Sequence, residues 1–421
     1  MSAKGVEGMI LFFYMLLKSL ISGVGLFALS SLSLTGDPML MYSTTVIFAM
    51  LFPIRGLCYY IATLAKGGKV TAGETIYVIV QILAVAAIVL LPKISFAAFV
   101  IAFEIYLTFC ICVELVDAYI YYKNRMTRYF VPSLCMGIFL LQIFIGVIVI
   151  PDAYRERLMM LGISVLWLLF GLAHICEFLV SIVPNRGFKR VMSSIRLTLP
   201  GFMGMCFPHR LFGLMRGESA KKEEVKPNAE VLFQFSRSGI GVAGHCELCI
   251  DGKTLTYGNY DPATRMVFRL AGDGIILRAQ RDKYIDYVVK NNKKIVFSYG
   301  LRLNEEQMDS IRNKLGELCA RFEDWSQDAK KLAPKEFARR LSDALGADVY
   351  KVTGGDFKTY FAPTINCVQI TDYLLRDTDI GRALTLGVNS PGAYMELFLR
   401  LFAQRNSPVI SMKVYGDNGA F

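Results

Sequence analysis

The sequence predicts a protein of two parts, a bundle of about six membrane-spanning helices followed by a cytoplasmic α+β domain. Long apolar runs fill the first half of the 421 residues, whereas the composition after about residue 217 is that of an ordinary globular domain. About 20 apolar residues are needed to cross the hydrocarbon core of a bilayer. We place the six spans near 9–33, 41–65, 73–92, 95–121, 129–151 and 158–184.

Changes in composition set the domain boundaries. The membrane domain is predicted to cover 1–186, and 187–228 mixes basic with large apolar residues, as in segments that lie in a membrane interface. The charged end of that segment, 218–228, is predicted to be a flexible linker. The α+β domain is predicted to cover 229–421, which is long enough for a core of its own.

Lysine and arginine near the spans predict the orientation, because cytoplasmic loops carry an excess of both. Ten fall on one side and three on the other, which predicts cytoplasmic termini in a multi-pass protein of the cell (inner) membrane. The three are Lys93, Arg155 and Arg157, and the ten are Lys4, Lys66, Lys69, Lys123, Arg125, Arg128, Arg186, Lys189, Arg190 and Arg196.

Cysteine spacing and net charge agree with a cytoplasmic domain beside a membrane. The ten cysteines show no spacing typical of a disulfide framework, which favours a reducing compartment. Much of the net charge of +11 lies beside the predicted spans, so anionic lipid is the expected partner and no nucleic acid is required.

Several ionisable side chains fall inside the predicted spans, where they are costly. They could mark a transport path, or they could pair with one another or lie near the interface. We favour pairing, because no single span concentrates them. The residues are Lys18, Arg55, Glu104, Glu114, Asp117, His174 and Glu177.

Alternation and helical spacing predict the elements of the α+β domain. Strands are predicted at 229–236, at 244–261 as a hairpin that turns at Asp251-Gly252, and at 266–280 around a Gly-Asp-Gly turn. Helices are predicted at 283–292, 304–325, 366–377 and 392–405, with further strands over 343–362 and 408–416.

A cysteine at a predicted helix start is the candidate nucleophile. Cys367 follows Asn366, where unpaired N–H groups and the positive end of the helix dipole lower the pKa of a thiol. The same N–H groups can bind the oxyanion of a tetrahedral intermediate. Of the three histidines, only His245 lies in the α+β domain, so it is the candidate base, while His174 and His209 lie elsewhere.

Each of these residues also has a plainer interpretation. A cysteine at a helix start is often a packed core residue, and a lone histidine on a strand is often structural. Cys246 and Cys249 beside His245 could indicate zinc, but no second ligand pair lies nearby, and the two point to opposite faces of an alternating strand. We therefore predict no metal and no cofactor.

The order of a histidine on an early strand and an Asn-Cys pair at a later helix resembles the circularly permuted NlpC-like branch of the papain fold. Lecithin retinol acyltransferase and several bacterial membrane-linked cysteine enzymes belong to that branch. The spans are separately similar, by hydropathy, to the HdeD-like six-helix membrane family. The segments that carry the NlpC-like resemblance are 244–261, 272–277, 299–307, 357–375 and 389–398, which span nearly all of the domain.

The resemblance implies a third polar residue, on the strand after the histidine, that orients the imidazole. A two-residue turn at Asp251-Gly252 would put Gly258 opposite His245, whereas a three-residue loop would put Tyr257 there. Tyr257 is our first choice and Asn259 our second. The second histidine of the retinol-acyltransferase relatives is absent from this chain.

The resulting hypothesis is a membrane-bound cysteine acyltransferase or hydrolase. Cys367 and His245 would act through a thioester on acyl ester or amide bonds of a lipid or lipidated protein, with Glu247 and Asn366 lining the substrate cleft. One alternative is a cysteine peptidase or amidase of cell-wall or other peptides, which needs the domain outside the cytoplasm. Another is a non-enzymatic membrane sensor or transporter subunit whose papain-like domain binds a ligand.

Overall fold

The structure is a computed structural model, and it describes most of the chain. The residues that it describes are 3–34, 57, 61, 72–90, 92–149, 152–182, 220–221, 226–236, 244–378, 380, 390–404 and 407–416.

The chain divides into two compact units. The first unit contains residues 1–16, 113–134 and 180–421, and the second contains 17–112 and 135–179. The second half of the chain therefore forms one unit together with two short segments from the first half, 1–16 and 113–134.

The prediction of about six spans is wrong for the part of the chain that the structure describes. Only Glu104–Lys123 and Thr127–Gly146 are long and apolar enough there to cross a membrane. Two shorter apolar helical runs, Ser19–Leu32 and Trp167–Cys176, also lie among the described residues. The predicted span at 41–65 lies almost wholly outside the described residues. The long helices of the first half are α1 (Ala3–Leu34), α3 (Ala72–Leu90), α4 (Pro92–Lys123), α5 (Thr127–Val149) and α6 (Asp152–Ile182).

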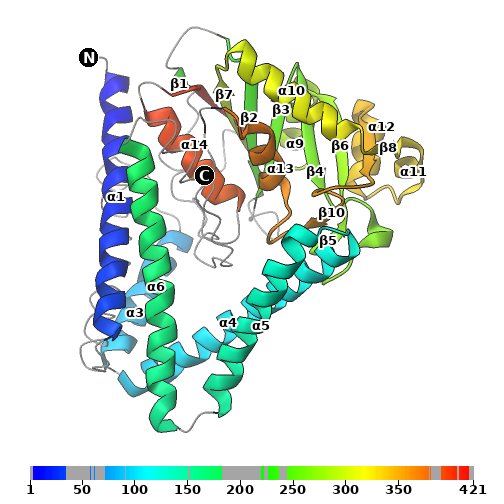
Figure 1. The fold of residues 1–421 in the computed structure, drawn as a ribbon. Coiled ribbons are helices and arrows are strands. Elements are labelled where there is room, and N and C mark those ends of the chain that lie inside the picture. Colours follow the sequence, from blue (N-terminus) through cyan, green and yellow to red (C-terminus); the bar gives the residue numbers. More distant parts are fainter. Residues whose placement is uncertain are drawn as a thin grey trace. The chain divides into compact units, whose positions relative to one another are not determined.

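A large antiparallel sheet dominates the second half (Figure 1). Its nine strands lie in the order β1-β11-β7-β2-β3-β4-β6-β9-β8, and β5 (Ala271–Asp273) and β10 (Thr359–Phe361) form a separate two-stranded ribbon. The nine strands are β1 (Ala220–Lys221), β2 (Ala229–Phe235), β3 (His245–Ile250), β4 (Lys253–Gly258), β6 (Ile275–Gln280), β7 (Ile295–Leu301), β8 (Phe322–Asp324), β9 (Asp348–Val352) and β11 (Val409–Tyr415).

Little of the interfacial segment and linker predicted at 187–228 falls within the described residues. Within it, Ala220–Lys221 pair with Ser411 and Met412 as strand β1, so these two residues belong to the sheet although the charged composition predicted a flexible linker.

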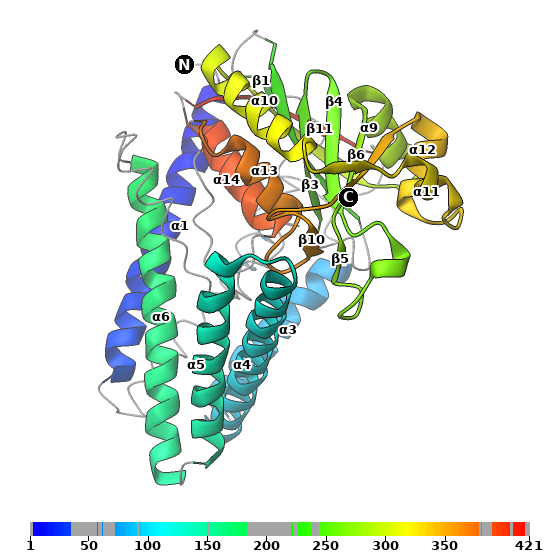
Figure 2. The same ribbon diagram turned by 45° about the vertical axis from the view of Figure 1, so that its right-hand side comes forward.

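Helices cover both faces of the sheet, because side chains alternate along each strand (Figures 1 and 2). Leu232 of β2 packs in a core with α9, α11 and α12, whereas its neighbour Phe233 stacks against Tyr394 and Phe398 of α14. The helices are α9 (Arg281–Lys290), α10 (Glu305–Cys319), α11 (Ser326–Lys331), α12 (Phe337–Leu345), α13 (Cys367–Leu375) and α14 (Pro391–Ala403), with a 3₁₀ turn at Pro262–Thr264.

The end of α4 is bound to the β5–β10 ribbon within the first unit. Asn124 Nδ2 donates to Thr359 Oγ1 at 3.0 Å, and Thr364 Oγ1 donates to Asp117 Oδ1 at 2.6 Å. Asp117 is buried, and its partner lies in the loop that leads to α13. One of the two helices that could cross a membrane therefore holds the segment immediately before Cys367.

Candidate functional site

The site lies where β3 and β4 separate, a place that we call the fork. Their ladder consists of three pairs, from Ile250–Lys253 to Leu248–Leu255. Beyond it, β4 continues beside β6 as far as the pair Gly258–Ile275. The start of β3 is thereby free of β4, and the backbone N–H of Cys246 donates to Sγ of Cys367 at 3.4 Å.

Cys367 is the first residue of α13, and Asn366 caps the helix. The Asn366 side chain accepts hydrogen bonds from the N–H groups of Val368 and Gln369, at 2.9 and 3.2 Å, and its amide donates to the carbonyl of Ala362. Such a cap is favoured because the first N–H groups of a helix lack partners within it. The buried side chain of Asn366 thus fixes the start of the helix. We predicted that Asn366 contacts substrate, but the structure places it at this cap.

The thiol of Cys367 is only 2% exposed, and this burial dominates its chemistry. Burial raises the pKa of Cys367 to about 12, although the N–H groups of Cys246, Val368 and Cys367 act to lower it. We expected the helix start to lower the pKa of this thiol, and that expectation is wrong for this conformation. At neutral pH the thiol is protonated.

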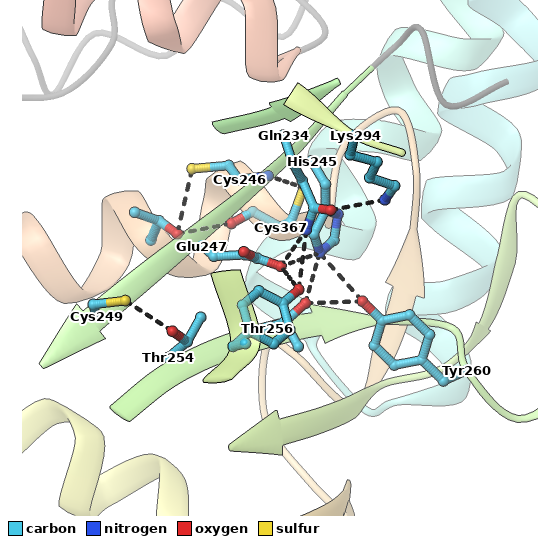
Figure 3. A network of polar contacts seen from close by, with 12 residues as sticks. Gln234, His245, Cys246, Glu247, Cys249, Thr254, Thr256, Tyr260, Lys294 and Cys367 are labelled. Atoms are coloured by element: carbon cyan, nitrogen blue, oxygen red, sulfur yellow. Dashed lines mark hydrogen bonds and ion pairs between the residues drawn. The ribbon is translucent and has the colours of Figure 1, made fainter. Parts of the chain in front are cut away.

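His245 stands at the start of β3 and is held by two hydroxyl groups. Its Nε2 lies 2.8 Å from Thr256 Oγ1 and 3.2 Å from the Tyr260 hydroxyl, and these two oxygens are 2.9 Å apart. Burial, and next the nearby ammonium of Lys294, lower the pKa of His245 to about 3. The imidazole is therefore neutral at pH 7 and has a fixed orientation (Figure 3).

Neither residue that we chose as the orienting group contacts His245. The Tyr257 hydroxyl donates to the carbonyl of Phe357 at 2.9 Å, and Asn259 Nδ2 donates to the carbonyl of Arg269 at 2.8 Å. The cause is the β3–β4 turn, in which Asp251 and Gly252 both have positive φ, as a two-residue hairpin turn requires.

The two-residue turn also determines which residue faces the histidine. The register of the ladder, with Leu248 opposite Leu255, puts Thr256 on the same face as Glu247 and His245 and sends Tyr257 to the other face. The Asp-Gly dipeptide was the signal that could have identified Thr256.

A buried polar cluster lies behind the imidazole. Glu247 is 1% exposed and accepts hydrogen bonds from Gln234 Nε2 at 2.5 Å and from the Tyr284 hydroxyl. Its Oε1 lies 3.9 Å from His245 Nε2, and Lys294 Nζ donates to Gln234 Oε1 at 2.8 Å. Burial raises the pKa of Glu247 to about 7. We predicted that Glu247 contacts substrate, but the structure places it in this cluster.

The cluster and the thiol meet at the first two residues of β3. Figure 3 shows the thiol of Cys367 bound to the backbone of Cys246, the residue that follows His245, and the imidazole bound to Thr256 and Tyr260. No hydrogen bond joins ring to thiol in the described part of the chain. The structure thus holds a neutral thiol and a neutral imidazole at the start of β3, and burial keeps both neutral.

The Cys-x-x-Cys pair does not converge on one point. Cys246 Sγ donates to Thr371 Oγ1 at 3.7 Å, whereas Cys249 Sγ lies 2.9 Å from Thr254 Oγ1. Thr371 belongs to α13 and Thr254 to β4, so the two sulfur atoms have separate surroundings.

In comparisons with known proteins, no family model, no curated protein and no solved structure matches the chain. The resemblance to the permuted NlpC-like branch therefore stays a prediction.

Proposed function

We propose that the domain is a thiol acyltransferase or hydrolase that acts on an acyl ester or amide bond of a lipid or lipidated protein. Cys367 is the nucleophile and His245 the general base. The observation that carries this proposal is the fork itself. It places a thiol at a helix N-terminus, on a backbone N–H donor, beside an imidazole that Thr256 and Tyr260 orient.

In the proposed reaction, the ring nitrogen of His245 that is not bonded to Thr256 and Tyr260 removes the thiol proton, and Sγ of Cys367 attacks the substrate carbonyl. The N–H groups that now face the thiol, those of Cys246 and of the first turn of α13, stabilise the oxyanion. The imidazolium then returns the proton to the leaving alkoxide or amine, which leaves a thioester. An acceptor hydroxyl or amine, or water, attacks the thioester and releases the thiol.

Access to the thiol requires the fork to open. A thiol with a pKa near 12 does not transfer its proton to an imidazole with a pKa near 3. Burial is the main cause of both shifts. Solvent or substrate that enters the fork therefore lowers the pKa of the thiol and raises the pKa of the imidazole. The proposed enzyme is therefore inactive in the closed conformation.

The helical segment supports a substrate at the membrane. Asp117 belongs to a helix that is long and apolar enough to cross a bilayer, and it accepts a hydrogen bond from Thr364, three residues before Cys367. An enzyme so attached gains proximity to lipids and lipidated proteins. We place the domain on the cytoplasmic side of the cell membrane, from the distribution of lysine and arginine.

A second candidate function is ligand binding without turnover, and the closed thiol favours it. The burial of Cys367 and its bond to the Cys246 N–H suit a packed residue as well as a nucleophile at rest. A peptidase or amidase outside the cytoplasm is the third, and a topology reporter fused after residue 416 distinguishes it by the side on which the reporter is found.

The deciding experiment traps the acyl-enzyme on the full chain in lipid nanodiscs. Activated acyl esters of a lipid and of a lipidated peptide are added, and the peptide that contains Cys367 is analysed by mass spectrometry. We expect an acyl adduct on Cys367 that is lost in Cys367→Ala and in His245→Ala but kept in Cys319→Ala, which removes a partly exposed thiol of α10. An adduct spread over several cysteines, or none on Cys367, rejects the thiol mechanism.

A further inference from the structure

A turn between β4 and β5 carries an exposed apolar tip. Phe268 is 98% exposed and Leu270 is 40% exposed, and they are the only large apolar residues classed as exposed among those described after residue 220. Arg269 lies between them and is also exposed. We call residues 266–270 the finger. In a domain that buries its other large apolar side chains, such a tip indicates a binding partner.

The finger is a rigid turn. Met266 and Ala271 exchange two backbone hydrogen bonds at its base, of 2.9 and 3.2 Å, and the N–H of Leu270 donates to the carbonyl of Val267 at 2.9 Å. Three consecutive residues, Val267, Phe268 and Arg269, have φ of 49°, 53° and 69°. This conformation is disfavoured for residues other than glycine, above all for a β-branched residue such as Val267. Backbone of this kind persists where it presents a side chain for function.

The finger lies at the end of the α4–α5 hairpin. Strand β5 begins directly after it and pairs with β10, whose Thr359 accepts a hydrogen bond from Asn124 between α4 and α5. Figures 1 and 2 both show β5 and β10 beside that end of the two helices. That end of the helical hairpin carries aromatic and basic residues, which are typical of a membrane interface. They are Tyr119, Tyr121, Tyr122, Lys123, Arg125, Arg128 and Tyr129.

We propose that the finger inserts into the surface of an anionic lipid bilayer. If the hairpin crosses the membrane, the ribbon that carries the finger lies where α4 leaves the hydrocarbon. Phe268 and Leu270 enter the boundary between head groups and acyl chains, and Arg269 contacts lipid phosphate. The aromatic and basic residues at the adjacent end of the α4–α5 hairpin favour a lipid surface over a protein partner.

Two hydrogen bonds connect the finger to Asn366, the residue before the thiol of Cys367. The carbonyl of Leu270 accepts from the N–H of Ala362 at 2.9 Å, and the carbonyl of Ala362 accepts from Asn366 Nδ2 at 2.9 Å. Asn366 caps the helix that begins with Cys367. A shift of the finger in lipid therefore moves the cap and opens the fork, a regulatory step that rests on the proposed function of Cys367.

Fluorescence in nanodiscs tests the docking on the full chain. In Phe268→Trp, brominated lipids quench the added indole if it lies in the bilayer. The matched control is Glu305→Trp, another exposed position, at the start of α10 and at the opposite end of the sheet from His245. Wild type supplies the background from Trp167 and Trp325. We expect strong added quenching for Phe268→Trp and for Leu270→Trp, and none for Glu305→Trp. Equal quenching at positions 268 and 305 overturns the docking.

Alkylation of Cys367 in the same discs tests the regulatory step. We expect its rate, read by mass spectrometry of the Cys367 peptide, to be several-fold higher in anionic than in zwitterionic discs, and Phe268→Ser to remove the difference. Quenching at position 268 with a lipid-independent alkylation rate overturns the coupling and keeps the docking. Lipid-dependent alkylation without an acyl adduct supports the coupling and counts against the proposed function alone.

Discussion

The fork and the finger belong to one unit of the molecule but differ in almost every respect. In the fork, Cys367 and Glu247 are buried, and both accept hydrogen bonds from neighbouring elements. In the finger, Phe268 is almost fully exposed and has no chemically reactive neighbour in its turn. The fork thus has reactive groups that are not exposed, and the finger is exposed but has no reactive groups. Two hydrogen bonds link the regions, from Leu270 through Ala362 to Asn366, and in the proposed mechanism turnover depends on this link.

The largest expected effect concerns the ionisation of the buried thiol. A pKa raised from 9.0 to about 12 leaves about 1,000-fold less thiolate at neutral pH than an ordinary cysteine has. In detergent, alkylation of Cys367 should therefore be slower than that of free cysteine in the same buffer by a similar factor, and it should still rise between pH 9 and pH 11. A rate that levels off near pH 8 would mean that the fork is already open.

The second effect is on stability, through Glu247. Its pKa is raised from 4.5 to about 7 in the folded protein, so folding favours the protonated carboxyl. The contribution of Glu247 is fully present below pH 4.5 and is lost as the pH rises to 7, by about 3 kcal/mol. Relative to wild type, Glu247→Gln should gain that amount between pH 4.5 and 7, measured as the free energy of unfolding in detergent.

His245 acts in the opposite direction and provides the control. Its pKa is lowered from 6.5 to about 3, so its unfavourable contribution appears as the pH falls below 6.5. Wild type should therefore show little change between pH 4.5 and 6.5, where the two contributions oppose each other. In His245→Asn the loss of stability with rising pH should be visible alone. A free energy of unfolding that does not change with pH in either Glu247→Gln or His245→Asn contradicts the assignment of the two pKa shifts to these residues.

The third effect is on the orientation of the imidazole. Thr256→Val removes a hydrogen-bond partner of Nε2 without a large change in volume, whereas Thr256→Ser keeps the hydroxyl. We expect the rate of acyl transfer to fall by about 10- to 100-fold in the valine variant and to stay near wild type in the serine variant. The pH profile of the rate should shift with the valine change, which a purely structural role would not cause.

The smallest effect is expected at the contact between α4 and the loop before Cys367. Thr364→Val removes the hydroxyl that donates to Asp117, and the net loss of one such hydrogen bond is about 1 kcal/mol. Alkylation of Cys367 should become a few-fold faster because the loop is less restrained. Ser326→Ala, which removes a hydroxyl bonded to Val349 away from this loop, should leave the rate unchanged.

Local signals predicted the site better than summed composition predicted the membrane part. The Asn-Cys pair and the single histidine of the domain led to Cys367 and His245, and the structure binds the thiol of Cys367 to the backbone N–H of Cys246, the residue after His245. The choice of Tyr257 went wrong at one turn, because Asp251 and Gly252 form a two-residue loop. Apolar runs alone overstated the number of spans, because among the described residues only Glu104–Lys123 and Thr127–Gly146 are long and apolar enough to cross a membrane.

The direction of the thiol pKa could not be predicted from the sequence. A helix start lowers it and burial raises it, and only the packing of α13 on the start of β3 determines which effect is larger. The helices α11 and α12 were likewise missed, and α11, at 6 residues, is too short to show a clear helical repeat.

The order of strands in the sheet has a consequence for how the chain folds. One edge of β7 pairs with β2, but the other is covered by β11, where Leu301 lies opposite Val409, 108 positions later. During synthesis, the N–H and C=O groups on this edge of β7 therefore remain unpaired until that later strand has been made. An unpaired strand edge is a template for aggregation. A chain interrupted before residue 409 should accordingly precipitate instead of folding with one strand fewer.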